Sequence, residues 1–340
     1  MKKLLSFVLL LTVCAVSSPL LTVGLAAETS EKVFEPDAVV AENTLALPER
    51  TSYDENTTVC LSVGGQTRTL ALKEYLVGVL AAEMPAGFPV EALKAQAVAA
   101  RTYTLYKMAL YSGEEVLPEG HNGADLCDDP GHCEAFLDLA VEADALWGES
   151  AEVYRQRLET AVAETDGMVL VYEDEPIAAV FCAASAEKTE SAADVWGRAL
   201  PYLTSVDSPG GSDCSQYEGT VTLRQSDFRD AVLAIAPEAD FSGAPGTWFR
   251  DSHRSEAGSV IDVLVGEVRL TGSQVRQAAG LNSANFKVKV DGENLVFTTV
   301  GYGHGVGLSQ YGARYLAMDG QTYDQILYHY YPGTQLRLEG

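Results

Sequence analysis

Alternating apolar and polar positions predict three β-hairpins. In each pair, two short alternating segments flank a turn of glycine or acidic residues. A further apolar run at 260–270 predicts a single strand. The paired segments are residues 58–63 with 66–72, residues 168–172 with 177–182, and residues 286–290 with 295–300.

Helical segments lie between and after these strands. Pro85 is expected to end one of them, and Pro89 to open an alanine-rich one. Ser150 and Ser226 are candidate helix caps. Strands and helices interleave without a βαβ period and no internal repeat is visible, so the pattern predicts an α+β fold. The expected helices cover residues 73–82, 89–110, 150–166, 273–279, 309–318 and 322–331.

The N-terminal region predicts export. Lys2 and Lys3 precede an uncharged apolar stretch ending at residue 27, which is typical of a signal peptide and is also long enough for a membrane anchor. Residues 28–56 are acidic and aperiodic and are expected to form a linker. We therefore expect an extracytoplasmic protein, secreted or membrane-anchored, whose folded part spans residues 57–340, with a smaller subdomain at 215–295.

The charge balance excludes some classes of partner. Lys and Arg number 23 against 48 Asp and Glu, which gives a net charge of −25. Phosphate backbones require a basic surface, so nucleic acid is not expected as a partner. An anionic lipid surface is disfavoured for the same reason.

Glu83 is the first candidate for catalysis. It is an isolated carboxylate among apolar neighbours at a predicted helix end, in the sequence Ala82-Glu83-Met84-Pro85. Removal from water raises the pKa of a carboxyl group, and a carboxyl that stays protonated near neutral pH can donate a proton to a glycosidic oxygen. An exposed glutamate at a helix end is the alternative.

The following helix contains candidates for substrate binding. Lys94 and Arg101 are seven residues apart and therefore share one helical face, which could hold substrate carboxylates. Gln96 and Tyr103 belong to the same segment. A solvated helix face is the alternative interpretation.

Alternating glycines surround a histidine near the C-terminus, in the sequence GYGHGVGLSQYGA from residue 301. This spacing predicts tight backbone turns or close approach of a substrate. It is not the spacing of a phosphate-binding loop, and no Lys-Ser/Thr pair follows. A glycine-rich turn around a core histidine is the other interpretation. The candidate substrate-binding residues of this segment are His304, Ser309, Gln310 and Tyr311.

Two histidines and two cysteines gather in one loop: His121, Cys127, His132 and Cys133. Two imidazoles and two thiolates suit tetrahedral zinc, and four protein ligands would close the shell around a structural ion. A Cys127–Cys133 disulfide is the rival expectation for an exported protein.

Several segments together resemble the SpoIID/LytB family. These segments are Glu83-Met84-Pro85, LKAQAVAARTY from residue 93, VRLTGSQVRQAAGLNSANF from residue 268, GYGHGVGLSQYGA, and Tyr328-His329-Tyr330-Tyr331-Pro332-Gly333. The resemblance extends over most of the chain beyond residue 57.

The resemblance implies a lytic transglycosylase of sporulation. Such enzymes cleave peptidoglycan glycan strands that have lost their stem peptides, and they leave an anhydro-muramyl end. Their catalytic glutamate corresponds to Glu83, and similar members hold zinc at the His/Cys cluster. The implied partners during engulfment are an amidase/endopeptidase, stage II sporulation protein P, and stage II sporulation protein M.

One segment departs from the family pattern. Members resemble His-Ser-x-Ser-Gly-Gly-x-Thr-Glu where this chain has residues 182–190, CAASAEKTE, so a histidine, a serine and two glycines are missing. If the segment lines the cleft, binding or rate is affected. Two other functions remain open: a non-catalytic peptidoglycan-binding enhancer of an amidase, and, less favoured, a zinc peptidase, which needs an open metal position.

Overall fold

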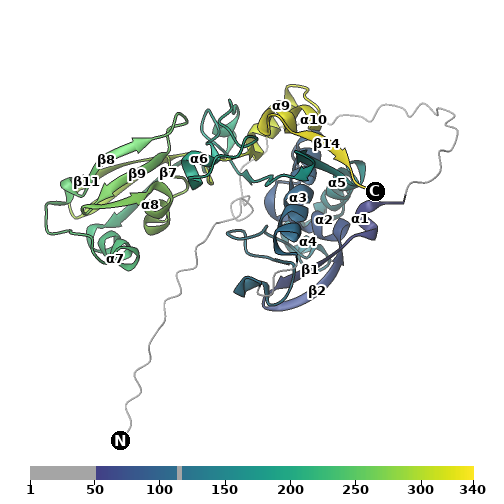
Figure 1. Ribbon diagram of the computed structural model, residues 1–340, viewed down its shortest axis with the longest axis horizontal. Coiled ribbons are helices and arrows are strands. Elements are labelled where there is room, and N and C mark those ends of the chain that lie inside the picture. The colour runs from purple at the N-terminus through teal and green to yellow at the C-terminus, as the bar shows by residue number, and fades with distance from the viewer. Residues whose placement is uncertain (1–50, 113–116) are drawn as a thin grey trace, which may run out of the picture.

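The computed structural model describes residues 51–112 and 117–340 and forms two lobes (Figure 1). We call residues 53–217 together with 301–338 the main domain, and residues 218–300 the inserted domain. The segment at 1–27 and the linker as far as residue 50 lie outside the described residues. Within the part that is described, no helix is long and apolar enough to cross a membrane. The predicted α+β class is confirmed, with helices and several small sheets.

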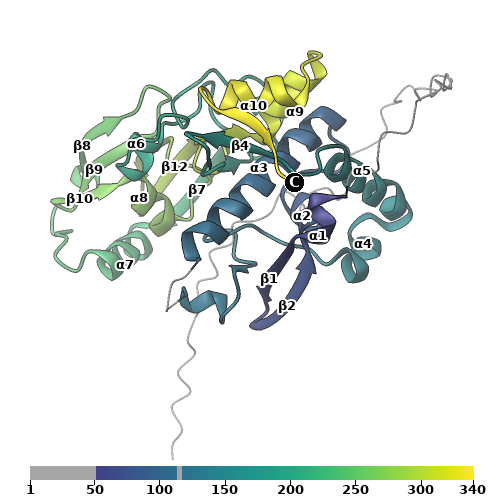
Figure 2. The same cartoon turned by 45° about the vertical axis from the view of Figure 1, so that its right-hand side comes forward.

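The main domain is built around helix α3. Its alanines between residues 92 and 100 are almost completely buried, and α2, α5, α9 and α10 pack against it. Small side chains permit this close packing on several faces of one helix. Figure 2 shows α3 crossing the centre of the domain. The main-domain helices are α1 (Tyr53–Asn56), α2 (Leu72–Glu83), α3 (Val90–Tyr111), α4 (Leu139–Trp147), α5 (Ala151–Glu164), α6 (Ala192–Trp196), α9 (Gln310–Met318) and α10 (Tyr323–Tyr330).

Three small sheets border this helical core. Their strand orders are β2-β1-β3, β14-β4-β5 and β13-β6. Strand β14 pairs antiparallel with β4, and β13 pairs parallel with β6, so the C-terminal segment completes sheets begun much earlier in the chain. The strands are β1 (Thr58–Val63), β2 (Gln66–Ala71), β3 (Leu126–Cys127), β4 (Met168–Tyr172), β5 (Glu175–Pro176), β6 (Phe181–Cys182), β13 (Leu308–Ser309) and β14 (Gln335–Leu338).

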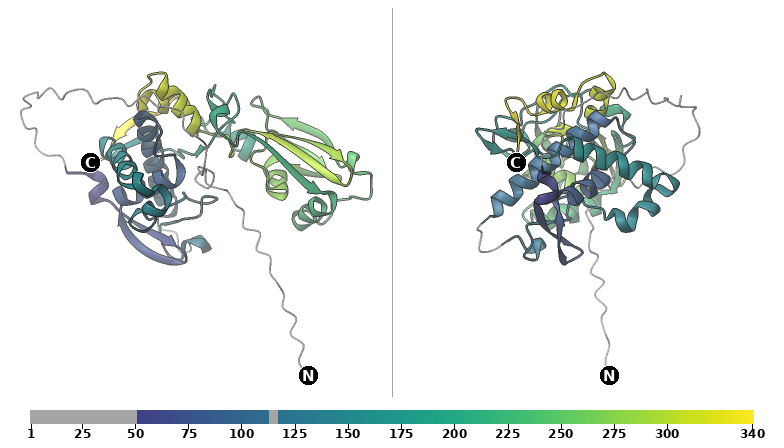
Figure 3. Two further views of the ribbon diagram at one scale, coloured as in Figure 1. Left: turned by 180° about the vertical axis from the view of Figure 1, so that it is seen from behind. Right: turned by 90° about the vertical axis from the view of Figure 1, so that its right-hand side faces the viewer.

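The inserted domain has a hydrophobic core of its own, centred on Phe228, Phe249 and Phe297. Two three-stranded sheets, β10-β9-β8 and β11-β12-β7, enclose it with two helices. Figure 3 shows this lobe beside the main domain from two further directions. Its elements are β7 (Glu218–Arg224), α7 (Gln225–Ile235), β8 (Phe249–Arg254), β9 (Val260–Val265), β10 (Val268–Thr271), α8 (Gly272–Ala279), β11 (Phe286–Asp291) and β12 (Asn294–Val300).

The chain leaves the main domain and returns to it at neighbouring positions. The backbone N–H of Gly301 donates to the carbonyl of Tyr217 at 2.7 Å. A second contact joins the backbone N–H of Ser259 to the Glu190 carboxylate at 3.2 Å, and Lys188 pairs with Glu256 beside it. The inserted domain is therefore held both at its junction with the main domain and through the segment around Ser259.

Most predicted elements are confirmed, and three predictions are wrong. The expected strand at 260–270 is two strands, β9 and β10, joined by a turn in which Gly266 and Glu267 have positive φ. In the expected strand at 177–182, only β6 is extended, because 177–180 form short-range bonds such as Ala179 N–H to the Ile177 carbonyl. Ser226 does not cap α7, whose N-cap is Arg224.

The first turn of the described fold anchors α3. Residues 53–56 form α1, and Asp54 of this helix is buried. The carboxylate of Asp54 accepts from Arg101 Nε at 2.8 Å and from Nη2 at 2.5 Å. Both side chains are almost fully inaccessible, so this ion pair belongs to the interior of the main domain.

Candidate active site and adjoining metal centre

Glu83 is the last residue of α2. Met84 is already extended, with φ −127° and ψ 135°, because the following Pro85 disfavours a helical conformation at the residue before it. The end of the helix thus places the Glu83 carboxyl at the wall of a cleft of about 390 Å³. Among the residues that the structure describes, Glu83 is the only aspartate or glutamate lining this cleft.

The cleft keeps the Glu83 carboxyl largely out of water. Burial raises its pKa to about 7, while the Ala135 N–H and the amide of Gln310 oppose the rise. The Ala135 N–H donates to Oε1 at 3.0 Å. A group with this pKa is partly protonated at neutral pH, so it can act as a general acid and, once ionised, as a base.

Gln310 is the second predicted residue that reaches the cleft. It is buried at the start of α9 and lines the same wall as Glu83. Its Nε2 forms no hydrogen bond of normal geometry with any described residue. Buried amide groups are usually paired, so this nitrogen is suited to a substrate hydroxyl or the Glu83 oxygen.

His304 also lines the cleft, but it is not arranged as a base. Its Nδ1 accepts the Val306 backbone N–H at 3.1 Å, so the ring proton lies on the other nitrogen, which faces the carbonyl of Phe181. Burial and the charge of Arg276 lower the pKa of His304 to about 4. The ring packs at a tilt against Trp196, with 5.4 Å between centroids and 52° between the ring planes, which suits a positioning role.

The alternating glycines allow the chain to run close to its neighbours here. Gly303 and Gly307 have positive φ values of 114° and 72°. A Cβ on Gly303 would lie 2.8 Å from the Cβ of Cys182, and one on Gly307 would lie 2.1 Å from the Val180 carbonyl oxygen. The predicted tight backbone is confirmed, and it brings the segment after residue 301 against the divergent segment 182–190.

Five predicted substrate-binding residues do not line the cleft. Arg101 is buried against Asp54, and Lys94 pairs with Glu91 and Glu164, so the expected cationic face is wrong: α3 is an interior helix. Gln96 is buried in α3 and does not line the cleft, and Tyr311 packs edge-on against Phe88. Ser309 also serves the fold, since its hydroxyl accepts the N–H groups of Gly312 and Ser185.

Tyr103 is the one residue of the predicted α3 set that lines the cleft. Three further aromatic side chains accompany it, and flat apolar surfaces of this kind suit the faces of sugar rings. Sequence reasoning missed Arg276, although it lies within a segment that carries the family resemblance. The aromatic residues are Tyr103, Phe181, Trp196 and Tyr302.

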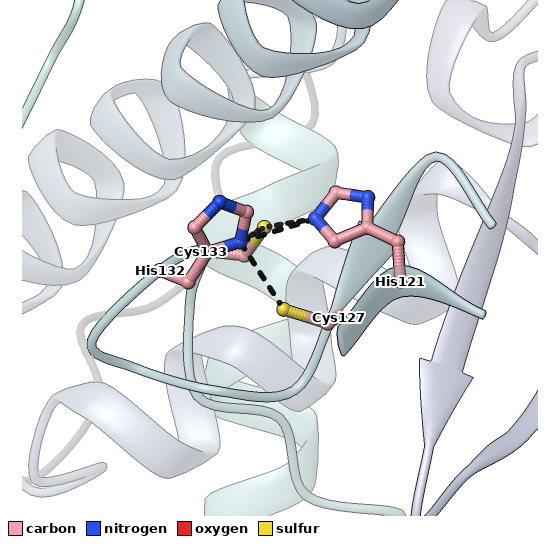
Figure 4. Close-up of side chains that lie close together, drawn as sticks. All are labelled: His121, Cys127, His132 and Cys133. Carbon is pink, nitrogen blue, oxygen red and sulfur yellow. Dashed lines mark hydrogen bonds between the residues drawn. The ribbon is translucent and has the colours of Figure 1, made fainter. Parts of the chain in front are cut away.

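The predicted metal ligands converge beside this cleft. Figure 4 shows all four side chains pointing toward one another, and their ligand atoms lie within 4.8 Å of each other. His121 Nε2 lies 3.1 Å from His132 Nδ1 and 3.4 Å from Cys133 Sγ, and Cys127 Sγ lies 3.5 Å from His132 Nδ1.

These separations fit a tetrahedral ion. Zinc–nitrogen and zinc–sulfur bonds of about 2.0 and 2.3 Å place neighbouring ligand atoms roughly 3.3–3.8 Å apart. The outer nitrogens are held as well: His121 Nδ1 meets the Ala124 carbonyl at 3.0 Å, and His132 Nε2 meets the Tyr111 hydroxyl at 3.1 Å. Cys127 and Cys133 are free thiols, not the disulfide considered as the alternative.

The loop that carries the candidate metal ligands also forms part of the cleft wall. His132 and Cys133 line the cleft, and Ala135, two residues further on, donates to Glu83. Lys107 of α3 donates to the His132 carbonyl at 2.8 Å and braces the loop from behind. Glu134 points away into the core, where Thr104 donates to its carboxyl at 2.9 Å.

Comparison with known proteins identifies relatives of this chain. The family model described as "Stage II sporulation protein" matches residues 64–172. Stage II sporulation protein D of Bacillus subtilis is 39% identical over 267 residues, which cover 78% of this chain and 74% of that protein. The Bacillus amyloliquefaciens protein of the same name is 34% identical over the same shares of each chain.

A more distant relative carries another name. The amidase enhancer of Bacillus subtilis is 26% identical over 312 residues, covering 77% of this chain and 40% of that protein. The degree of identity to the two sporulation proteins, extending over most of both chains, decides the assignment. This chain belongs to the stage II sporulation protein D family.

Proposed function

We propose that this protein acts in sporulation as a peptidoglycan lytic transglycosylase that cleaves denuded glycan strands. The observation that carries the proposal is the single carboxyl group of the cleft, Glu83, with a pKa raised to about 7 by burial. Glycoside hydrolases of the usual kind use two carboxylates that flank the bond. One carboxyl is sufficient when the substrate supplies its own nucleophile.

In this reaction Glu83 acts first as the proton donor and then as the proton acceptor. The protonated Glu83 gives its proton to the glycosidic oxygen as the bond from that oxygen to C1 of the muramyl sugar breaks. The 6-hydroxyl oxygen of the same sugar bonds to C1, and the Glu83 carboxylate accepts the hydroxyl proton. The products are a strand with a new 4-hydroxyl and a 1,6-anhydro-muramyl end, and the enzyme is returned to its starting state.

Zinc at His121, Cys127, His132 and Cys133 is part of the proposal. The donor set and spacing suit this ion, and four protein ligands complete its shell. When bound, it would supply structural rigidity to the loop that contacts Glu83. A zinc peptidase is not supported, because that chemistry needs a metal position open to substrate.

The decisive experiment compares the unaltered protein with Glu83→Gln on denuded glycan strands, using mass analysis of the products. We expect anhydro-muramyl ends from the unaltered protein and a loss of at least about 1,000-fold in the variant, with glycan binding retained. A non-catalytic amidase enhancer, the function named for the distant relative, predicts no anhydro ends and equal stimulation of an amidase by both proteins. The proposed cellular setting is extracytoplasmic, together with the sporulation proteins P and M.

A further inference from the structure

Arg276 connects the inserted domain to the cleft. It lies in the last turn of α8, and its side chain lines the cleft that holds Glu83. A capping box at Thr271 fixes the start of this helix. Beyond its end, the Asn282 carbonyl accepts the Gly303 N–H at 3.0 Å, which ties the helix to the glycine-rich segment. The position of Arg276 is therefore set from both ends of α8.

The guanidinium of Arg276 has no anionic partner within the described part of the chain. Its Nε donates to the Leu281 carbonyl at 3.2 Å, and no described carboxylate lies within ion-pair distance. By contrast, Arg101 and Arg269 both pair with aspartates. Of the described residues, Arg276 is also the only lysine or arginine that lines the cleft.

The surroundings of Arg276 make this unpaired charge costly. The side chain is partly buried, and burial lowers the pKa of the guanidinium from its usual value, although arginine remains charged. Cys182 and His304 line the same cleft; burial raises the pKa of the Cys182 thiol to about 12 and lowers that of His304 to about 4, so neither provides a negative charge near neutral pH. A partly desolvated cation without a counter-charge is unfavourable until an anion binds beside it.

We propose that Arg276 binds the lactyl carboxylate of a muramyl residue and thereby selects strands without stem peptides. This inference rests on the proposed function. In an intact strand the lactyl carbonyl is part of an uncharged amide, whereas removal of the peptide exposes a carboxylate. A guanidinium can donate two parallel N–H bonds to a carboxylate, and an amide cannot accept them in the same way.

The test compares two forms of the same strands. Denuded glycan is used either with free lactyl carboxylates or after conversion of these groups to methylamides with carbodiimide and methylamine. The unaltered protein should cleave the free form with a kcat/KM about 10- to 100-fold above that for the methylamide. Arg276→Gln should remove this preference by slowing only the free form. Arg276→Lys should keep part of this preference, since lysine retains the positive charge but cannot donate two parallel N–H bonds.

Arg229→Gln is the matched control. Arg229 is exposed on α7 of the same domain, does not line the cleft, and loses the same charge in the variant. Its substrate preference should equal that of the unaltered protein. A purely structural Arg276 predicts equal losses on both forms together with a lower melting temperature, and that result overturns the proposal. Faster cleavage of the methylamide form by the unaltered protein overturns it too, because Arg276 would then not favour a carboxylate.

The two levels of inference fail differently. If the unaltered protein cleaves neither form, the proposed function is wrong. If it cleaves the free form and Arg276→Gln shows the same preference, the transglycosylase remains and only the role of Arg276 is rejected.

Discussion

The backbone N–H of Ala135 lies 3.0 Å from Oε1 of Glu83 and donates a hydrogen bond to it. Ala135 follows the metal-site residue Cys133 by two positions, and Lys107 holds the same loop through the His132 carbonyl. The proposed metal site and the proposed general acid are therefore linked by a few covalent bonds and one hydrogen bond. Several expected behaviours follow from this arrangement and from the burial around it.

Removal of the metal should lower both stability and activity. Cys133→Ser should lose bound zinc and melt at a lower temperature, because binding energy at a closed site contributes directly to folding. Chelation of the unaltered protein should lower kcat, and added zinc should restore it, since the loop positions the Glu83 partner. Elemental analysis and thermal melts provide the measurement, with Cys60→Ser as the control. One zinc retained in Cys133→Ser would contradict the assigned ligand set.

The pH dependence of cleavage should report Glu83. The folded pKa of about 7 lies above the ordinary 4.5, so kcat/KM should fall about tenfold per unit above pH 7 as the proton is lost. Initial rates between pH 5 and 9 measure this. A rate that rises through this range would show that the ionised form begins the reaction and would refute the acid role.

The same group should affect stability. Because the folded state holds this proton more tightly than the unfolded chain, the free energy of unfolding should decline as pH rises from 4.5 through 7. The change from this group is on the order of 3 kcal/mol. Burial also raises the pKa of Glu134, so the slope should be taken as the difference between the unaltered protein and Glu83→Gln in urea unfolding. Identical slopes in both proteins would mean that Glu83 is solvated.

His304 should stay neutral through the working range. With a pKa lowered to about 4, its ring should show no titration between pH 8 and 5 in proton NMR, whereas an unperturbed histidine titrates near 6.5. His304→Ala should reduce turnover without shifting the pH profile. Titration of His304 near pH 6.5 would show that the cleft is more open than the structure indicates.

Arg101 should matter for stability and not for substrate selection. Arg101→Gln leaves the Asp54 carboxylate buried without its partner, which costs about 3–5 kcal/mol. Lys94→Gln, at a more accessible ion pair, should cost less than about 1 kcal/mol. Urea unfolding gives both values, and activity is expressed per folded molecule. A raised KM in a fully stable Arg101 variant would restore the substrate-binding interpretation that the structure rejects.

Gly307→Ala should disrupt the glycine-rich segment. The added Cβ would lie 2.1 Å from the Val180 carbonyl oxygen, at a φ of 72° that disfavours alanine. The combined clash and strain should cost more than about 2 kcal/mol. Gly246→Ala is the control, because nothing lies within 4 Å of its added Cβ and its φ is ordinary. Equal thermal stability of the two variants would show that the backbone moves aside freely.

The sequence located those candidate site residues that can be recognised from their neighbours along the chain. Glu83 was recognisable because a proline ends its helix, and the metal ligands were recognisable because they crowd into one loop. Periodicity also located most helices and hairpins. It could not separate β9 from β10, because the run is apolar on both sides of Gly266 and only the glycine indicates a turn.

The sequence could not predict roles that depend on distant partners. Arg101 looked like a substrate ligand, because its partner Asp54 lies 47 residues earlier, in a stretch that resembled a linker. Arg276 had no visible role, because only the packing of the inserted domain against the main domain brings it to the cleft that Glu83 also lines. The sequence shows that a residue is charged, and only the tertiary fold shows whether that charge already has a partner within the protein.

The junction at Tyr217 and Gly301 also determines the order in which the chain can fold. Every contact inside the inserted domain is made within residues 218–300, whereas the main domain needs β14 to pair with β4 across more than 160 residues. Contacts between segments so far apart in the sequence form slowly, because closing a long loop costs conformational entropy. We therefore expect the inserted domain to gain hydrogen-exchange protection first in refolding, and the cleft, which needs both ends of the main domain, to form last.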